Sequence, residues 1–136
     1  MAYKSREKAI EYQKDWRSKN KNSAMYRAKE MLRSIKHRSK KLGLEYDIDE
    51  EWLKGKLKGV CEATGLPFNF NDVKKGYTRN PNTPSIDRID SSRGYTKDNC
   101  RVVIWMFNGA KLEYDDGCFY AMAKAFVNEY ERKLGL

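Results

Sequence analysis

The segment of residues 84–111 constrains the fold most strongly, because two short apolar runs flank a polar turn within it. In residues 85–89 the isoleucines alternate with Asp87, so one face of a strand is expected to be apolar and the other charged. Residues 90–94 supply the polar residues and the glycine of a turn, and residues 101–105 are β-branched and aromatic enough to form the returning strand. The segment therefore predicts a β-hairpin.

A helix is predicted directly after this hairpin, beginning near Met106. Asn108 and Lys111 are three residues apart, so they occupy neighbouring positions on one face of that helix. This arrangement brings Asp87, on the first strand, and Asn108, on the helix, within reach of a single ion.

The hairpin and helix together resemble the HNH nuclease motif, also called ββα-metal, in which both elements hold one catalytic divalent cation over a scissile phosphate. In that family a carboxylate and a histidine end the first strand, an asparagine fixes the loop, and a histidine or asparagine follows nine residues later with a lysine three beyond it. The matching positions here are Asp87, Arg88, Asn99, Asn108 and Lys111. The pattern is most similar to the DR…GY…N…N-x-x-K subgroup, found in phage-borne nucleases and at least one rare-cutting restriction enzyme.

The resemblance implies a metal-dependent DNA endonuclease. Its implied catalytic residues are Asp87, Arg88, Asn99 and Asn108. The Asp87 carboxylate and the Asn108 side-chain oxygen are the implied ligands of one Mg²⁺ or Mn²⁺ ion, which prefers oxygen donors.

Arg88 occupies the position at which most of the family has a histidine as general base. A guanidinium does not lose its proton at working pH, so Arg88 is better suited to holding a phosphate. The base that activates water stays open between His37, a carboxylate such as Asp90, and hydroxide from the bulk solvent.

Many relatives also carry a structural zinc ion bound by two C-x-x-C pairs. In this chain the first pair is reduced to Cys61 and Thr64, and the positions of the second are Ile104 and Phe107. Four thiolates at tetrahedral spacing are absent from the sequence, so we expect no structural zinc and a packed hydrophobic contact in its place.

The basic side chains are unevenly distributed. The chain has 136 residues and a formal net charge of +9. Residues 1–43 hold 14 basic and four acidic side chains, whereas residues 44–136 hold 14 and 15. We therefore expect a basic DNA-binding arm over residues 1–43 and an HNH-like domain over residues 44–136, with double-stranded DNA as the partner.

The arm is predicted to contain two helices, over residues 4–18 and 23–41, the second of which ends at Gly43. The residues expected to contact DNA are those of the arm, the turn and the motif helix that can carry positive charge: Arg27, Arg33, Lys36, His37, Lys40, Lys41, Arg93 and Lys111.

The other segments are predicted to support the hairpin. Residues 44–48 alternate like a short strand, and Asp49 is placed to cap a helix that ends near residue 57. A last helix, through about residue 133, is expected to pack on the core. Its inward face would consist of Cys118, Met122, Ala125, Phe126 and Tyr130. The expected fold class is α+β and mostly helical, a ββα-metal core with a basic helical arm and a C-terminal helix.

The three cysteines form no paired disulfide framework, and no apolar run is long enough for a signal peptide or a membrane span. We expect a cytoplasmic protein, in the bacterial host if the chain is phage-encoded, without a membrane partner. A monomer would nick DNA, and a homodimer could break both strands. Two other functions fit the pattern, a catalytically inactive HNH-like DNA-binding module and a structure-specific junction resolvase.

Overall fold

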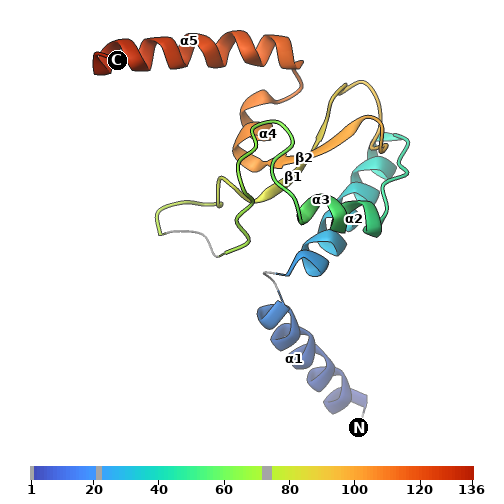
Figure 1. Cartoon of the computed structure of the whole chain (residues 1–136). Coiled ribbons are helices and arrows are strands. Elements are labelled where there is room, and N and C mark those ends of the chain that lie inside the picture. The colour runs from blue at the N-terminus through green and yellow to red at the C-terminus, as the bar shows by residue number, and fades with distance from the viewer. Residues whose placement is uncertain (1, 21–22, 72–74) are drawn as a thin grey trace.

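The computed structural model describes residues 2–20, 23–71 and 75–136. In these residues helices precede and follow a two-stranded antiparallel sheet (Figure 1). The elements are α1 (Ala2–Asn20), α2 (Ala24–Leu42), α3 (Glu50–Leu57), β1 (Pro84–Arg88), β2 (Cys100–Ile104), α4 (Trp105–Lys111) and α5 (Asp116–Leu134). The predicted α+β class is confirmed, and the two strands of the hairpin lie one residue earlier than expected.

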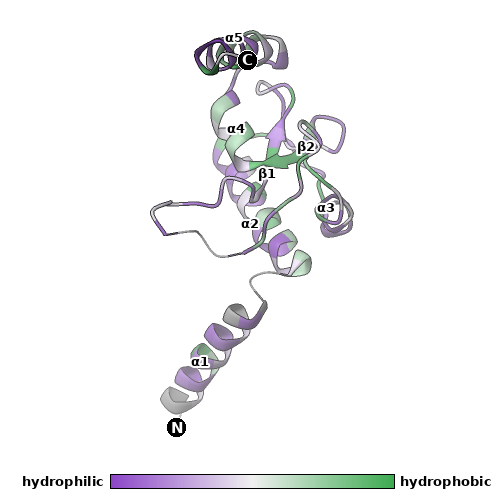
Figure 2. Ribbon diagram, turned by 60° about the vertical axis from the view of Figure 1, so that its left-hand side comes forward, coloured by the Kyte–Doolittle hydropathy of each residue, from purple (hydrophilic) through white to green (hydrophobic). Residues whose placement is uncertain are grey.

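α1 projects away from the rest of the chain (Figure 1), and Figure 2 shows that it is largely hydrophilic. Its described side chains are exposed apart from Trp16, whose ring meets Tyr26 of α2 edge-on, with the ring centroids 5.8 Å apart. α2 begins at Ser23, whose hydroxyl oxygen accepts a hydrogen bond from the Tyr26 amide, and it ends at Gly43 in a left-handed conformation with φ 64°. The predicted cap at Gly43 is confirmed.

α2 shares its core with α3 and the hairpin. The buried residues of this core are Ala28, Ile35, Ile48, Leu53, Leu57, Tyr95, Cys100 and Val102. Because Ala28 and Ile35 belong to α2, this helix is part of the domain that holds the hairpin, and only α1 extends from it as an arm. Asp49 caps α3 as predicted, with its Oδ1 accepting a hydrogen bond from the Trp52 amide at 2.8 Å.

The hairpin pairs Asp87 with Arg101 and Arg88 with Cys100. The short strand predicted over residues 44–48 is reduced to one isolated bridge, between Tyr46 and Tyr95. Ile89, expected on the apolar face, lies beyond the end of β1 and is exposed.

A close backbone contact requires glycine at position 94. A Cβ atom at this position would collide with the Glu45 carbonyl oxygen and lie 2.9 Å from the Glu45 backbone nitrogen. The Tyr95 amide donates a hydrogen bond to the same carbonyl at 2.8 Å. Only glycine therefore permits the chain before α3 to lie against the hairpin turn.

A second, smaller cluster lies at the far side of the sheet, where relatives of the resembled family carry zinc. It contains Cys61, Val103 and Ile104, with Phe107 packed against it. The Ile104 amide donates a hydrogen bond to Cys61 Sγ at 3.3 Å. The predicted hydrophobic packing of Ile104 and Phe107 is confirmed, while the independence of folding from zinc stays a prediction.

The packing predicted for α5 was wrong. The side chains expected to face the core are exposed: Cys118, Met122, Ala125, Phe126 and Tyr130. α5 contacts α4 near its first turn, where the rings of Phe107 and Phe119 meet edge-on at 4.9 Å, and Figure 1 shows it extending from there across one end of the molecule. An amphipathic pattern identifies the apolar face of a helix but does not determine what covers that face.

Candidate active site

The side chain of Asn108 joins α4 to the first strand. Its Nδ2 donates hydrogen bonds to Ser85 Oγ at 2.8 Å and to the Ile86 carbonyl oxygen at 3.0 Å. Side chains alternate along a strand, so Ser85 and Asp87 lie on the same side of β1. Asn108 is therefore held on the side of β1 that carries Asp87, with its Nδ2 engaged by these two acceptors.

The Asp87 carboxylate is buried between two cations. Lys111 Nζ lies 3.1 Å from its Oδ1 and 3.4 Å from its Oδ2, and Arg101 Nε donates to Oδ2 at 2.9 Å. The side chains of Asp87 and Lys111 are 2% and 1% exposed. A buried ion pair of this kind is costly to break, because either partner alone would be an uncompensated buried charge.

Lys111 is therefore not on an open surface. The sequence placed it among the DNA-contacting residues, but the structure places its ammonium behind Asp87, where it also donates to the Arg88 carbonyl oxygen at 3.3 Å. This position follows from the docking of α4 on β1, which turns the face of Asn108 and Lys111 inward.

Arg101 was not predicted as a site residue. Its Nη1 donates to Asp116 Oδ2 at 2.9 Å, so one guanidinium bridges Asp87 and the first residue of α5. The hydrogen bonds from Arg101 hold the pKa of Asp116 below its ordinary value. The signal for Arg101 lay in the hairpin register, which sets it directly opposite Asp87.

Asn99 fixes the turn, as the resemblance implied. Its Nδ2 donates to the carbonyl oxygens of Asp90 at 3.0 Å and Gly94 at 2.9 Å, and its Oδ1 accepts the Asp90 amide at 3.0 Å. The side chain is buried. Asn99 therefore fixes the conformation of the loop that follows Arg88.

Arg88 lies half-buried along this loop. Its Nη1 donates to the Arg93 carbonyl oxygen at 3.0 Å, and its guanidinium lies over the Tyr95 ring at 5.0 Å. Because a guanidinium has five N–H donors, Arg88 retains donors for a phosphate. Arg93 itself is exposed and paired with Asp98 at 2.7 Å.

The two side chains considered as general bases differ in their surroundings. Hydrogen bonds from the Ser92 hydroxyl and amide lower the pKa of Asp90, which weakens it as a base. His37 is exposed on α2.

The exposed residues of α2 that were predicted to contact DNA are Arg33, Lys36, His37, Lys40 and Lys41, while Arg27 is half-buried.

The donor atoms at β1 and α4 fit a hard divalent cation in kind. A carboxylate oxygen of Asp87 and the side-chain oxygen of Asn108 are of the kind that Mg²⁺ and Mn²⁺ accept as ligands. Lys111 already neutralises this carboxylate, so a cation would have to share or displace the lysine contact. Within the ranges that the structure describes, no group of three His, Cys, Asp or Glu side chains is arranged to hold a metal ion.

Comparisons with known proteins support the fold. No family model and no curated protein matches the chain. Among solved structures, the chain is similar to the rare-cutting HNH restriction endonuclease PacI, a protein that perturbs DNA, with a TM-score of 0.53 and 15% sequence identity. The similarity covers 78% of this chain and 80% of that chain. The fold is therefore HNH-like. No helix in the described part of the chain is long and apolar enough to cross a membrane.

Proposed function

We propose that the chain is a metal-dependent DNA endonuclease that hydrolyses phosphodiester bonds. The observation that supports this most directly is the placement of Asn108 next to Asp87, through its hydrogen bonds to Ser85 and Ile86, on an HNH-like fold. This placement matters because the two side chains come from different elements, and the motif spacing alone does not guarantee that they meet.

In the proposed reaction Asp87 and Asn108 hold one Mg²⁺ or Mn²⁺ ion, which would supply positive charge to the phosphate and the leaving oxygen as negative charge develops there. Lys111 and Arg101 fix the orientation of the Asp87 carboxylate. Arg88 donates its remaining N–H groups to a non-bridging phosphate oxygen, and Asn99 keeps the turn that carries Arg88 in shape. For the base, the lowered pKa of Asp90 argues against this carboxylate and leaves His37 and solvent hydroxide as candidates.

Double-stranded DNA is the proposed partner. The arm, α1, carries basic side chains along its length, and α2 presents a further exposed row that includes Lys36, Lys40 and Lys41. Cations of this kind bind the phosphate backbone without reading sequence.

One observation favours the alternative of a DNA-binding module without chemistry. The ammonium of Lys111 already contacts both oxygens of the Asp87 carboxylate that a cation would need. If Lys111 never leaves this position, the hairpin would bind DNA and not cut it.

Supercoiled plasmid distinguishes these functions. The protein is incubated with plasmid in Mg²⁺, in Mn²⁺ and in EDTA, and the products are separated by electrophoresis. We expect nicked or linear plasmid with either cation and intact plasmid in EDTA. Retardation of intact plasmid under all three conditions would favour the inactive module, and cleavage of a four-way junction alone would favour a resolvase.

We also propose that two copies pair through α5, which would allow both strands to be cut. The apolar residues of α5 are exposed, and they include Phe126 (65%) and Tyr130 (55%). Tyr120, Met122, Val127 and Leu134 of α5 are exposed as well, so a second copy could cover several large apolar side chains on this helix. In an antiparallel pair, the acidic start of α5 at Asp116 would lie beside Arg132 and Lys133 of the other copy.

Sedimentation velocity tests this pairing. Phe126→Glu places a charge on the apolar face and should convert a dimer to a monomer. Asn128→Glu is the matched control, because it makes the same charge change about 200° away around the same helix. A parent chain that sediments as a monomer at high micromolar concentration, or an equal effect of both substitutions, would contradict pairing through α5.

A further inference from the structure

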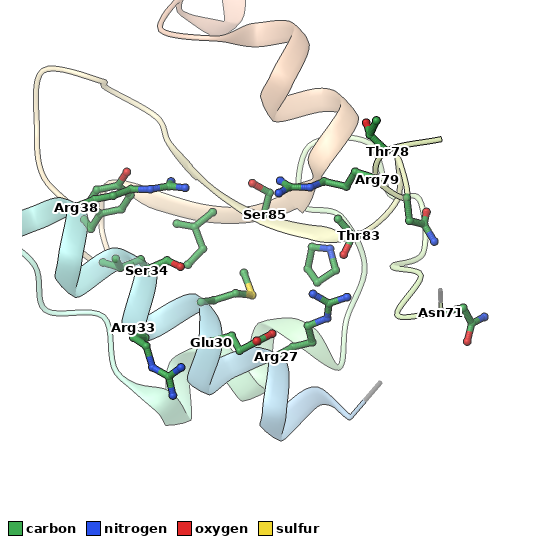
Figure 3. Close-up of a pocket in the computed structure, with 16 residues that line it drawn as sticks. Arg27, Glu30, Arg33, Ser34, Arg38, Asn71, Thr78, Arg79, Thr83 and Ser85 are labelled. Atoms are coloured by element: carbon green, nitrogen blue, oxygen red, sulfur yellow. The ribbon is translucent and has the colours of Figure 1, made fainter. Parts of the chain in front are cut away.

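A cavity of about 510 Å³ lies between α2, β1 and the segment that leads into β1 (Figure 3). We call it the arginine pocket, after the four arginines in its lining, Arg27, Arg33, Arg38 and Arg79. A water molecule takes about 30 Å³ in the liquid, so the volume corresponds to roughly 17 waters. This is room for a phosphate group together with the sugar attached to it.

The charge of the arginine pocket selects an anion. Four guanidiniums, which stay protonated at any working pH, line it together with a single carboxylate among the described lining residues, Glu30. Glu30 already accepts a hydrogen bond from the Tyr26 hydroxyl at 2.8 Å. In Figure 3 Arg38 and Arg79 extend toward each other near Ser85, whereas Arg33 turns away.

Two polar atoms of the lining are buried without a partner in the described structure. They are the hydroxyl oxygen of Thr83, a residue that is 8% exposed, and Nε of Arg27. A buried donor that makes no hydrogen bond is costly, and such groups in native proteins usually await a ligand or a water. A hydroxyl and a guanidinium N–H both suit phosphate oxygens.

The arginine pocket is continuous with the candidate active site through Ser85. The Ser85 hydroxyl accepts the hydrogen bond from Asn108 and also lines the pocket. Arg79 is held over the ring of Trp105, the first residue of α4, at 5.3 Å. The pocket is therefore lined by β1, and one of its arginines contacts α4, the two elements that carry the candidate metal ligands.

We propose that the arginine pocket binds a backbone phosphate that neighbours the scissile one on the DNA strand, and that Ser85 couples this phosphate to the orientation of Asn108. The inference rests on the proposed endonuclease function. Ser85 and Asp87 are two residues apart on β1, roughly 6.6 Å, which is close to the through-space separation of successive phosphates along one DNA strand. Ser85 can donate its hydroxyl proton to the phosphate while it accepts from Asn108.

Binding is measured first, by fluorescence anisotropy of a labelled duplex in EDTA, so that the result does not depend on cleavage. Arg79→Ala and Thr83→Val should each weaken binding about tenfold, the scale of one lost hydrogen bond to a charged group. Arg79→Ala should also reduce the slope of log K against log salt by about 0.9. Lys58→Ala, which removes an exposed charge at the end of α3 outside the pocket, should do neither.

The position of the phosphate is tested by replacing single phosphates of the duplex with neutral methylphosphonates. A methylphosphonate at a position next to the cleavage site should weaken binding to the parent chain and leave binding to Arg79→Ala unchanged. If Arg79→Ala and Lys58→Ala behave alike, or if no methylphosphonate position depends on Arg79, the pocket does not bind DNA phosphate.

The coupling through Ser85 has a separate readout. Ser85→Ala should lower kcat at least tenfold with KM nearly unchanged, and Ser85→Thr, which keeps the hydroxyl, should restore most of the loss. Equal kcat in all three proteins would refute the coupling. A parent chain that binds through the pocket but never cleaves would instead refute the proposed function and leave the pocket intact as a phosphate site.

Discussion

Replacement of Lys111 by methionine tests the most unexpected feature of the candidate site. Methionine keeps an unbranched stem that fills irregular space, so the substitution removes the ammonium with little change in packing. It leaves Asp87, 2% exposed, with Arg101 as its remaining cationic partner at 2.9 Å.

The expected loss of folding stability in Lys111→Met depends on the burial of the Asp87–Lys111 ion pair. Removing one partner of a buried ion pair costs about 3–5 kcal/mol, and the surviving Arg101 contact places Lys111→Met near the lower end, about 3 kcal/mol. For a domain of this size 1 kcal/mol corresponds to roughly 4 °C in Tm, so Tm should fall by about 12 °C. A folded state should persist, because domains are stable by about 5–15 kcal/mol.

Urea unfolding followed by circular dichroism measures this loss. Lys54→Met is the matched control, since Lys54 forms an ion pair with Glu50 at 3.1 Å on a partly exposed helix face and should cost less than about 1 kcal/mol. If Asp87 lies in a cation site, Mg²⁺ at ten times its dissociation constant should raise the free energy of unfolding of Lys111→Met by about 1.4 kcal/mol, and that of the parent chain by less. Equal losses of unfolding free energy in the two methionine variants would contradict the burial of the Asp87–Lys111 ion pair.

Three further outcomes are expected. Deletion of residues 1–21 removes seven basic and three acidic side chains. DNA binding should weaken and its dependence on salt should become shallower, while the circular dichroism of the remaining chain is retained. An unchanged salt dependence would exclude the arm from the DNA interface. EDTA should leave Tm nearly unchanged because Ile104 and Phe107 pack at the positions where many members of the resembled family bind zinc, and one tightly held zinc per chain in a metal analysis would overturn this. Arg101 lowers the pKa of Asp116, so this carboxylate stabilises the fold above its ordinary pKa of 3.8, and that contribution is lost as pH falls through the folded pKa. Below about pH 4 the stability of Asp116→Asn, measured by urea unfolding, should therefore fall less than that of the parent chain. Parallel stability curves for the two proteins would contradict the ion pair.

Local signals in the sequence determined the parts of the fold that were predicted. The hairpin and α4 follow from alternation and turn residues, and the caps at Gly43 and Asp49 follow from the hydrogen bonds that helix ends require. Asn99 and Asn108 were selected by the motif spacing; the structure shows that Asn99 bonds the turn and Asn108 bonds β1, and their catalytic roles stay predictions.

The rest depends on how elements dock, which no single stretch of sequence encodes. Lys111 is buried because of the way α4 lies on β1, and a lysine in a helix gives no sign of that in advance. The arginine pocket brings Arg38 and Arg79 together from segments 41 residues apart. The apolar face of α5 was visible in the sequence, but whether another part of the same chain covers it was not.

The role of Asp87 is tested most directly by plasmid cleavage. Asp87→Asn keeps the size of the side chain and removes its charge, so the buried Lys111 retains a hydrogen-bond acceptor, and circular dichroism checks that the variant is folded. We expect the parent chain and Glu51→Gln, which changes an exposed carboxylate on α3, to cut supercoiled plasmid in Mg²⁺ or Mn²⁺. Asp87→Asn and Asp87→Ala should cut slower by several orders of magnitude while still retarding DNA. Cleavage by either Asp87 variant at the rate of the parent chain would show that the catalytic centre lies elsewhere.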